Sequence, residues 1–443
     1  MWPVCRPVRV AFITVPTFTN LLASLAVDPH VRGRQFEHLC RWYLTNDPQY
    51  RGILRRVWLW DEWTGRWGVD AGIDLVAEDH MGRLWAIQAK AYGQQYAVTK
   101  ADVDTFLAES SRTVFSYRLL IATTDKLSST ARRTIDAQEK AVGLVGLSDL
   151  LTADVEWPAD PGQLRPSPKL EPARPHDYQQ EAIDAVVTGF DTAERGQLIM
   201  ACGTGKTLTA QFISKELDAQ RILVLVPSLS LLKQTMRVWQ GQGQVEVLPV
   251  CSDETVSRGE DTPVEHVSEL GLPVTTNPAD IAEFLRTGSG PRVVFCTYQS
   301  SPRITEAFTF DHVPAFDLVI ADEAHRCTGQ SSSFTTVLDS DRIRAARRLF
   351  MTATPRFFTG RIVKAASEGD LEVASMDDET GFGKVFHRLS FGEAISRDLL
   401  TDYQVAIVGV DDSTYRSYAE KALWSPAKVK TSPMLGPWPD RSG

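Results

Sequence analysis

Long hydrophobic runs are missing from this sequence. No segment approaches the ~20 uncharged apolar residues that a membrane-spanning helix requires. Residues 8–16 faintly suggest a signal peptide, but Arg9 interrupts the apolar run and no small-residue cleavage site is evident. We therefore expect a cytoplasmic protein with no membrane partner.

Cysteine is scarce, and positive charge is not in excess. The six cysteines are scattered along 443 residues without the spacing of metal ligands, which predicts reduced thiols in a cytoplasmic protein. The formal net charge of -9 provides no overall attraction to nucleic acid. Any DNA contact must therefore come from local patches.

Proline, by contrast, is concentrated in one segment, and the length of 443 residues allows two or three domains. The crowded positions are Pro158, Pro161, Pro166, Pro168, Pro172 and Pro175. Such a composition predicts a semi-rigid linker. We expect an N-terminal extension at 1–30, a first domain at 31–156, the linker at 157–175, a second domain at 176–375 and a final irregular segment at 376–443.

A phosphate-binding loop is the most specific motif in the sequence. It lies between an apolar run at 197–199 and a segment with a helical pattern. A strand, a glycine-bearing loop and a helix N-terminus together aim backbone N–H groups and the positive end of the helix dipole at an anion. The residues expected to bind nucleotide here are Met200, Ala201, Cys202, Gly203, Thr204, Gly205, Lys206 and Thr207.

The side chains of this loop match the needs of ATP and Mg²⁺. Gly203 and Gly205 permit backbone conformations that a Cβ would forbid. Lys206 supplies a charge for the β- and γ-phosphates, and the Thr207 hydroxyl can hold Mg²⁺. Met200 departs from the pattern G-x-x-x-x-G-K-[ST], in which glycine occupies this position.

Two acidic residues follow a buried strand downstream of the loop. Apolar strands alternate with helical segments after residue 220, which predicts a parallel sheet covered on both faces. Ligands bind beyond the carboxyl ends of such strands, so Asp322 and Glu323 should lie beside the loop. Asp322 can hold the Mg²⁺ contacted by Thr207, and Glu323 can orient the attacking water.

A further nucleotide contact is expected at Tyr178 and Gln179, just upstream of the loop. A glutamine amide can bind adenine through two hydrogen bonds, at N6 and N7. The alternative is that these residues form an exposed helix N-terminus.

The first domain contains a second candidate site. Residues 69–78 and 84–91 have the pattern of two antiparallel strands joined by a short turn. Gln88 and Lys90 are two residues apart and share one face, and Asp74 can lie opposite them. Asp74 and the Gln88 amide oxygen can hold a divalent cation, while Lys90 can orient or deprotonate water for phosphodiester hydrolysis. The alternatives are Asp70 as the carboxylate, or an edge-strand aspartate with a surface lysine.

These residues resemble the Mrr-like branch of the PD-(D/E)xK nuclease superfamily over about residues 30–155. In that branch a glutamine commonly takes the middle acidic position, as Gln88 does here. The resemblance implies a restriction-endonuclease-like α/β domain with Asp74, Gln88 and Lys90 as its site. It also implies Glu37, on a helix at 34–44, as an auxiliary metal residue.

The second domain resembles the first motor domain of superfamily 2 helicases over about residues 174–360. Five segments after Tyr178-Gln179 occur in the family's order: Met200–Thr207 (motif I), Val226–Gln234 (Ia), Thr297–Ser300 (Ib), Asp322–His325 (the DEAH box) and Thr352–Thr354 (III). The resemblance implies a RecA-like parallel-sheet domain that binds ATP and Mg²⁺. It also implies that motifs Ia and Ib touch the nucleic-acid backbone.

The order of the two domains is that of the type ISP restriction-modification enzymes. That resemblance implies an ATP-dependent, Mg²⁺-requiring endonuclease and translocase with double-stranded DNA as its partner. No motif VI pattern follows residue 355. We therefore expect a truncated or frameshifted end, or a second polypeptide that supplies the second motor lobe, the methyltransferase and target recognition.

Two other functions remain open from the sequence. One is a non-catalytic subunit or remnant that binds nucleotide and DNA without turnover. The other is an RNA helicase, which the DEAH box alone would allow and the nuclease domain opposes. Residues 252–290 have the composition of an insertion, and the sequence assigns no role to them.

Overall fold

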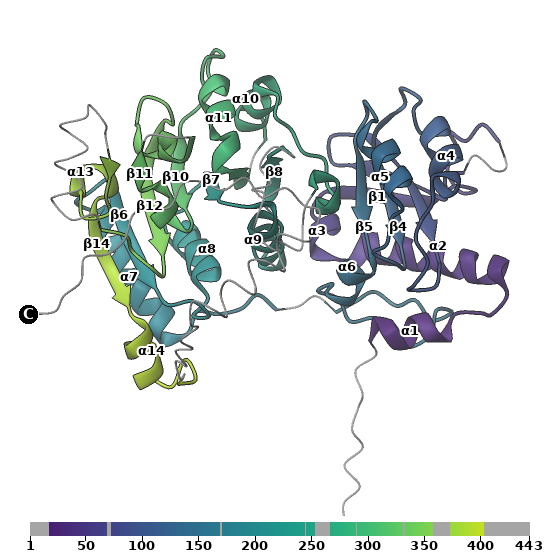
Figure 1. The fold of residues 1–443 in the computed structure, drawn as a ribbon, viewed down its shortest axis with the longest axis horizontal. Coiled ribbons are helices and arrows are strands. Elements are labelled where there is room, and N and C mark those ends of the chain that lie inside the picture. The colour runs from purple at the N-terminus through teal and green to yellow at the C-terminus, as the bar shows by residue number, and fades with distance from the viewer. Residues whose placement is uncertain are drawn as a thin grey trace, which may run out of the picture. The chain divides into compact units, whose positions relative to one another are not determined.

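The computed structural model describes residues 17–68, 72–168, 171–243, 245–252, 266–288, 290–330, 333–357 and 373–402. The alternative carboxylate Asp70, most of the N-terminal extension, part of the insertion and residues 403–443 of the final segment lie outside these ranges. Residues up to Leu399 form one compact unit that contains two separate large sheets (Figure 1).

The first sheet has five strands in the order β1-β2-β3-β4-β5. Its strands are β1 (Leu54–Leu59), β2 (Leu75–Asp79), β3 (Leu84–Lys90), β4 (Phe115–Ala122) and β5 (Val142–Val145). The first three pair antiparallel and the last three pair parallel. The predicted pairing of two antiparallel strands is confirmed as β2–β3, although β2 begins only at Leu75.

Six helices surround this sheet in the described part of the first domain. They are α1 (Phe18–Ser24), α2 (Pro29–Asn46), α3 (Pro48–Arg51), α4 (Lys100–Glu109), α5 (Ser129–Asp136) and α6 (Leu147–Leu151). The long helix α2 begins at Pro29 because Asp28 caps it, accepting hydrogen bonds from the backbone N–H groups of His30 and Val31. Its predicted apolar face is buried, as shown by Phe36 and Leu44.

The proline-rich segment starts against the first domain. The Trp157 ring is buried, with its centroid 4.6 Å from that of Phe18 and 5.3 Å from that of Trp42. The backbone N–H of Ser167 donates to the Asn46 amide oxygen at 2.7 Å. The first part of this segment is therefore packed on α2 instead of extending freely.

The second sheet has seven parallel strands in the order β14-β6-β12-β10-β7-β9-β8. They are β6 (Arg195–Met200), β7 (Arg221–Val226), β8 (Glu246–Val250), β9 (Arg292–Thr297), β10 (Phe316–Ala321), β12 (Ala345–Thr352) and β14 (Lys384–Leu389). The predicted α/β class with a parallel sheet is confirmed. Because β14 pairs with β6, the sheet extends past residue 375, where we placed the end of the domain.

Helices cover both faces of this sheet (Figure 1). They are α7 (Asp177–Phe190), α8 (Lys206–Glu216), α9 (Leu229–Gly241), α10 (Pro278–Arg286), α11 (Ser301–Ala307), α13 (Glu379–Phe382) and α14 (Phe391–Ser396). Short 3-10 turns are η2 (Val267–Leu270), η3 (Tyr298–Ser300), η4 (Ala324–Cys327) and η5 (Ser333–Leu338), and β11 (Gly329–Gln330) pairs with β13 (Val373–Ala374). Among the described residues, no helix is long and apolar enough to span a membrane.

One buried carboxylate makes the stability of the first domain depend on pH. Asp47 ends α2 and caps α3, where it accepts a hydrogen bond from the backbone N–H of Gln49 at 3.0 Å. Burial raises the pKa of Asp47 to about 6, and the charge of Arg237 opposes this shift. A raised pKa means that stability is fully present below the ordinary pKa and is lost as the pH rises through about 6.

We expect Asp47→Asn to stabilise the protein at pH 7.5 by up to about 3 kcal/mol, because asparagine retains the cap and never carries the buried charge. The gain should shrink as the pH falls and vanish near the ordinary pKa of aspartate. Urea unfolding at several pH values measures it. The control is Asp104→Asn, which alters an exposed ion pair with Lys100 and should change little. A gain that is independent of pH, or a loss at pH 7.5, would contradict the assignment.

Candidate active sites

The predicted nuclease residues meet at the junction of β2 and β3. Asp74 directly precedes β2, and its carboxylate accepts a hydrogen bond from the backbone N–H of Ala89 at 2.7 Å. Ala89 lies between Gln88 and Lys90 on β3. The Asp74 carboxylate is therefore fixed against the part of β3 that carries the other two side chains.

The side-chain amide of Gln88 is buried, and its oxygen lacks a hydrogen-bond partner in the described part of the chain. Its side chain is only 3% exposed, and its amide nitrogen donates to the carbonyl of Gly72 at 3.0 Å. The amide oxygen Oε1 is buried without a hydrogen-bond partner. An unsatisfied buried oxygen is costly, and oxygen is the ligand that a hard divalent cation prefers. The site therefore fits a cation held by Gln88 and Asp74.

The remaining metal ligands would have to be oxygens of other kinds. Within the described ranges, no group of three or more His, Cys, Asp or Glu side chains is arranged to hold a metal ion. A cation at Asp74 and Gln88 would thus also need backbone carbonyls and water, as Mg²⁺ commonly does. Lys90 lies half-buried at the end of β3.

Glu37 reaches the same region from α2. Burial, followed by the charges of Asp74 and Glu37, raises the pKa of the Cys40 thiol well above its usual range. Both carboxylates therefore lie near this buried cysteine. The Glu37 carboxylate is 2.7 Å from the Arg34 guanidinium, which also holds Asp61 at 2.6 Å. Its role as an auxiliary metal residue remains a prediction.

Two tyrosines beside the nuclease residues were not predicted from the sequence. Tyr92, two positions after Lys90, donates to Asp102 at 2.7 Å, and Tyr96 donates to the same carboxylate at 3.0 Å. The pKa of Tyr92 is raised, mainly by burial, and the negative charge of Asp74 raises it further. Tyr92 therefore lies close enough to Asp74 to sense its charge. Its position two residues beyond Lys90 was the available signal.

The phosphate loop has the backbone that the sequence predicts. Gly203 and Gly205 have φ values of 84° and 76°, in the left-handed region that favours glycine. The Thr204 hydroxyl donates to the carbonyl of Ala201 at 2.7 Å and closes the loop on itself. Lys206 then begins α8, so the N–H groups of the first turn face the loop. The exposed Cys202 thiol lies 3.9 Å from the Lys206 amine.

Gln179 is bound to this loop. Its amide oxygen accepts from the backbone N–H of His176 at 3.0 Å, and its amide nitrogen makes a long contact of 3.5 Å to the carbonyl of Thr204. Tyr178 stacks on His176 with the ring centroids 5.7 Å apart. Reading of adenine by Tyr178 and Gln179 remains a prediction, and Gln179 would have to exchange these contacts to do it.

The acidic pair lies opposite Lys206. Burial, and then the charge of Glu323, raises the pKa of Asp322 to about 6, while the Lys206 amine lowers it. The hydrogen bond from His325 holds the pKa of Glu323 below its usual range, against the effect of burial, and the Lys206 charge adds to this lowering. The loop and the acidic pair follow β6 and β10, whose carboxyl ends lie at the same edge of the parallel sheet with β12 between them.

Hydrogen bonds connect the acidic pair to the neighbouring motifs. The Tyr298 hydroxyl, after β9, donates to the backbone carbonyl of Asp322 at 2.7 Å. His325 Nδ1 lies 3.3 Å from the Glu323 carboxylate and 3.0 Å from the Thr352 hydroxyl at the end of β12. This network offers Glu323 a physical connection to the Thr352–Thr354 segment. The sequence had not assigned a role to Tyr298 at this site.

Two families match consecutive parts of the chain. Residues 45–163 match a restriction endonuclease family, and residues 173–357 match the family of the res subunit of type III restriction enzymes. Each match covers one of the two domains described above.

Known proteins resemble this chain over part or nearly all of its length. The DNA-bound structure of the ATP-dependent type ISP restriction-modification enzyme LlaBIII is 34% identical, with a TM-score of 0.74, and the match covers 93% of this chain and 27% of that enzyme. A nuclease-deletion mutant of the type ISP enzyme LlaGI, in complex with a DNA substrate mimic, is 31% identical over 57% of this chain and 23% of its own, with a TM-score of 0.41. A probable helicase of African swine fever virus (isolate Tick/South Africa/Pretoriuskop Pr4/1996) is 34% identical over 58% of this chain and 28% of its own length. The chain thus spans about a quarter of the length of each of these relatives.

The orphaned oxygen of Gln88 leads to a test of the metal site. We expect Gln88→Met, which retains most of the volume but removes the oxygen, to weaken the apparent Mg²⁺ affinity for DNA cleavage by ~10-fold or more. Gln88→Glu, which retains a ligand oxygen, should remain Mg²⁺-dependent. Metal titrations of plasmid cleavage measure both variants, with circular dichroism as the control for folding. Equal Mg²⁺ dependence in Gln88→Met and the unmodified chain would remove Gln88 from the metal site.

Proposed function

We propose that this chain, an Mrr-like nuclease domain joined to the first motor domain of a type ISP-like restriction-modification enzyme, binds double-stranded DNA and couples its cleavage to ATP hydrolysis. The proposed role is restriction of foreign DNA in phage defence. The observation that carries the proposal is the match of 93% of the chain, both domains in the same order, to a type ISP enzyme bound to DNA.

The motor site supports ATP binding through residues already positioned. The glycine-bearing loop presents backbone N–H groups, and Lys206 at the start of α8 adds a positive charge for the β- and γ-phosphates. Thr207 and Asp322 are the residues that would hold Mg²⁺, which neutralises charge on the phosphates when bound. Glu323 would orient the attacking water, and the hydrogen bond from His325, which lowers the pKa of the Glu323 carboxyl, supports this role.

The nuclease site supports phosphodiester hydrolysis by a different set of residues. Asp74 and Gln88 would hold a divalent cation, which polarises the scissile phosphoryl group when bound. Lys90, at the end of the same strand, can orient or deprotonate the attacking water and offset the charge that develops on phosphate.

The first test is ATP turnover by the purified chain with and without duplex DNA. We expect turnover that DNA stimulates, and its loss in Lys206→Ala, because the loop then lacks the charge that faces the phosphates. Lys215→Ala, at the other end of α8, is the matched control and should retain turnover. Nucleotide binding without turnover would overturn the proposed hydrolysis and favour a nucleotide- and DNA-binding subunit.

The nuclease is tested separately by plasmid cleavage. We expect Mg²⁺-dependent cleavage of double-stranded DNA that falls by ~100-fold or more in Lys90→Ala, because one positioned acid–base group contributes that much. Lys100→Ala, at an exposed ion pair on α4, is the control. Cleavage that persists in Lys90→Ala would assign the activity to other residues, and preference for RNA over duplex DNA would favour an RNA helicase.

A further inference from the structure

The helix α9 has a polar face that is buried. Lys233, Arg237 and Gln240 recur at intervals of four and three residues and so lie on one face of the helix. Another face of α9 packs on the motor sheet, where the ring centroids of Trp239 and Phe295 are 5.8 Å apart. A helix of this kind should present its polar face to water. Instead, the side chains of Lys233 and Arg237 are only 13% and 24% exposed.

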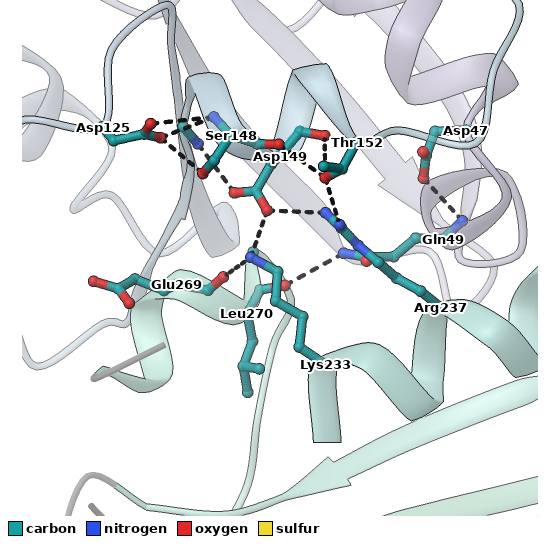
Figure 2. A network of polar contacts seen from close by, with 12 residues as sticks. Asp47, Gln49, Asp125, Ser148, Asp149, Thr152, Lys233, Arg237, Glu269 and Leu270 are labelled. Carbon is teal, nitrogen blue, oxygen red and sulfur yellow. Dashed lines mark hydrogen bonds and ion pairs between the residues drawn. The ribbon is translucent and has the colours of Figure 1, made fainter. Parts of the chain in front are cut away.

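The nuclease domain covers this face. Asp149 of α6 lies 2.6 Å from the Lys233 amine and 2.9 Å from the Arg237 guanidinium, which also donates to the Thr152 hydroxyl at 3.1 Å. Figure 2 shows Asp149 between the two cations. A largely buried charge is tolerated only where partners compensate it with good geometry. This cluster therefore stabilises one placement of α6 on α9 and disfavours sliding of one over the other.

A backbone segment of the motor forms the rest of the contact. In Figure 2 the Gln49 amide donates to the carbonyl of Leu270 at 3.3 Å, and Lys233 donates to the carbonyl of Glu269. The Tyr50 hydroxyl donates to the carbonyl of Gly271 at 3.1 Å. The turn η2 and Gly271 therefore present a row of carbonyl groups to α3 and α9.

Gly271 shows how closely the two domains approach. Its φ is 66°, and a Cβ at this position would lie 2.6 Å from the Tyr50 hydroxyl and 3.3 Å from the carbonyl of Leu144 on β5. A residue with a Cβ would be strained at this φ, and it would require the Tyr50 hydroxyl to move. Arg132 of α5 and Glu269 of η2 form a further ion pair at 2.8 Å across the same boundary.

We propose that residues 266–272 and the polar face of α9 form a docking element that fixes the nuclease domain to the first motor domain as one rigid body. This assigns a role to part of the 252–290 insertion. Helix α9 begins just after β7 and contacts α3. The strand β7 is in turn connected to the acidic pair, because its Leu225 carbonyl accepts a hydrogen bond from the backbone N–H of Asp322. The same element is then the route by which a change at the nucleotide site reaches the nuclease. This coupling between the two sites rests on the proposed function, whereas the docking of the two domains does not.

Hydrogen exchange on the full chain tests the docking without any ligand. In Gly271→Ala the added methyl forces the Tyr50 hydroxyl away, and in Asp149→Asn both cations lose their charged partner. We expect backbone amides in α3, α6 and η2 to exchange faster by about tenfold or more in both variants, while β4 and β10 keep their protection. Gly82→Ala is the matched control for Gly271→Ala, because Gly82 has a φ of 76° and open space around it.

The outcomes of this experiment separate docking from local strain. Faster exchange confined to residues 266–272 in Gly271→Ala, with α3 and α6 unchanged in both variants, would overturn the docking element. Loss of protection throughout both sheets in Gly271→Ala would report unfolding of the protein. In that case the exchange of α3 and α6 in Asp149→Asn, which adds no volume, would decide whether the domains are docked.

A second measurement tests the coupling itself. We expect Asp149→Asn to retain DNA-stimulated ATP turnover and the Mg²⁺-dependent nuclease, but to lose the dependence of cleavage on ATP. Cleavage that still follows ATP in this variant would overturn the coupling route. A full chain without turnover or cleavage would instead reject the proposed function, and the exchange experiment would still decide whether the domains are docked.

Discussion

The motor site depends on the carboxyl-terminal edge of one parallel sheet. Every strand of a parallel sheet ends at that edge, so residues that are distant in sequence meet there. The acidic pair is held in place by its neighbours, because the Leu225 carbonyl accepts the backbone N–H of Asp322 and the Tyr298 hydroxyl donates to its carbonyl. Lys206, which follows another strand, is close enough to lower the pKa of both carboxylates. The strand order therefore determines the site more than any local motif does.

The nuclease site is organised by a different constraint, the use of polar atoms inside a small mixed sheet. The Asp74 carboxylate accepts a hydrogen bond from the backbone of β3, and the Gln88 amide nitrogen donates one to the backbone of the loop before β2. These two hydrogen bonds connect that loop to β3. The Gln88 amide oxygen is buried without a hydrogen-bond partner among the described residues. Because a buried polar atom is costly when it is unsatisfied, this position would be better filled by leucine or methionine in a purely structural strand. The amide at this position is therefore consistent with the proposed cation ligand.

The sequence predicted the parts of this fold that are buried on both sides. The central strands β7, β9 and β10 were located because they are almost continuously apolar, and the phosphate loop because its glycines, lysine and threonine follow a strand. The strands β1, β8 and β14 were missed. Each lies at the edge of its sheet and exposes several side chains, so no apolar run or strict alternation marks it.

The sequence also did not reveal which groups each polar side chain contacts in the folded protein. The pattern around Gln179 predicted a base-reading amide, which remains a prediction, but it did not reveal that this amide contacts His176 and Thr204. The buried amide oxygen of Gln88 could not be anticipated either, because local spacing does not say which polar atoms remain without partners.

The same limit explains why the sequence did not reveal the contact between the two domains. Periodicity separates the apolar from the polar face of a helix, but it does not say whether water or another domain lies against the polar one. In α9 the polar face contains Lys233 and Arg237, which are ordinary residues for a solvated surface. Their burial becomes favourable only because Asp149, more than eighty residues earlier in the chain, is brought between them. A contact of this kind is specific because each of its charges would be unstable alone, and it therefore joins the two domains in one arrangement.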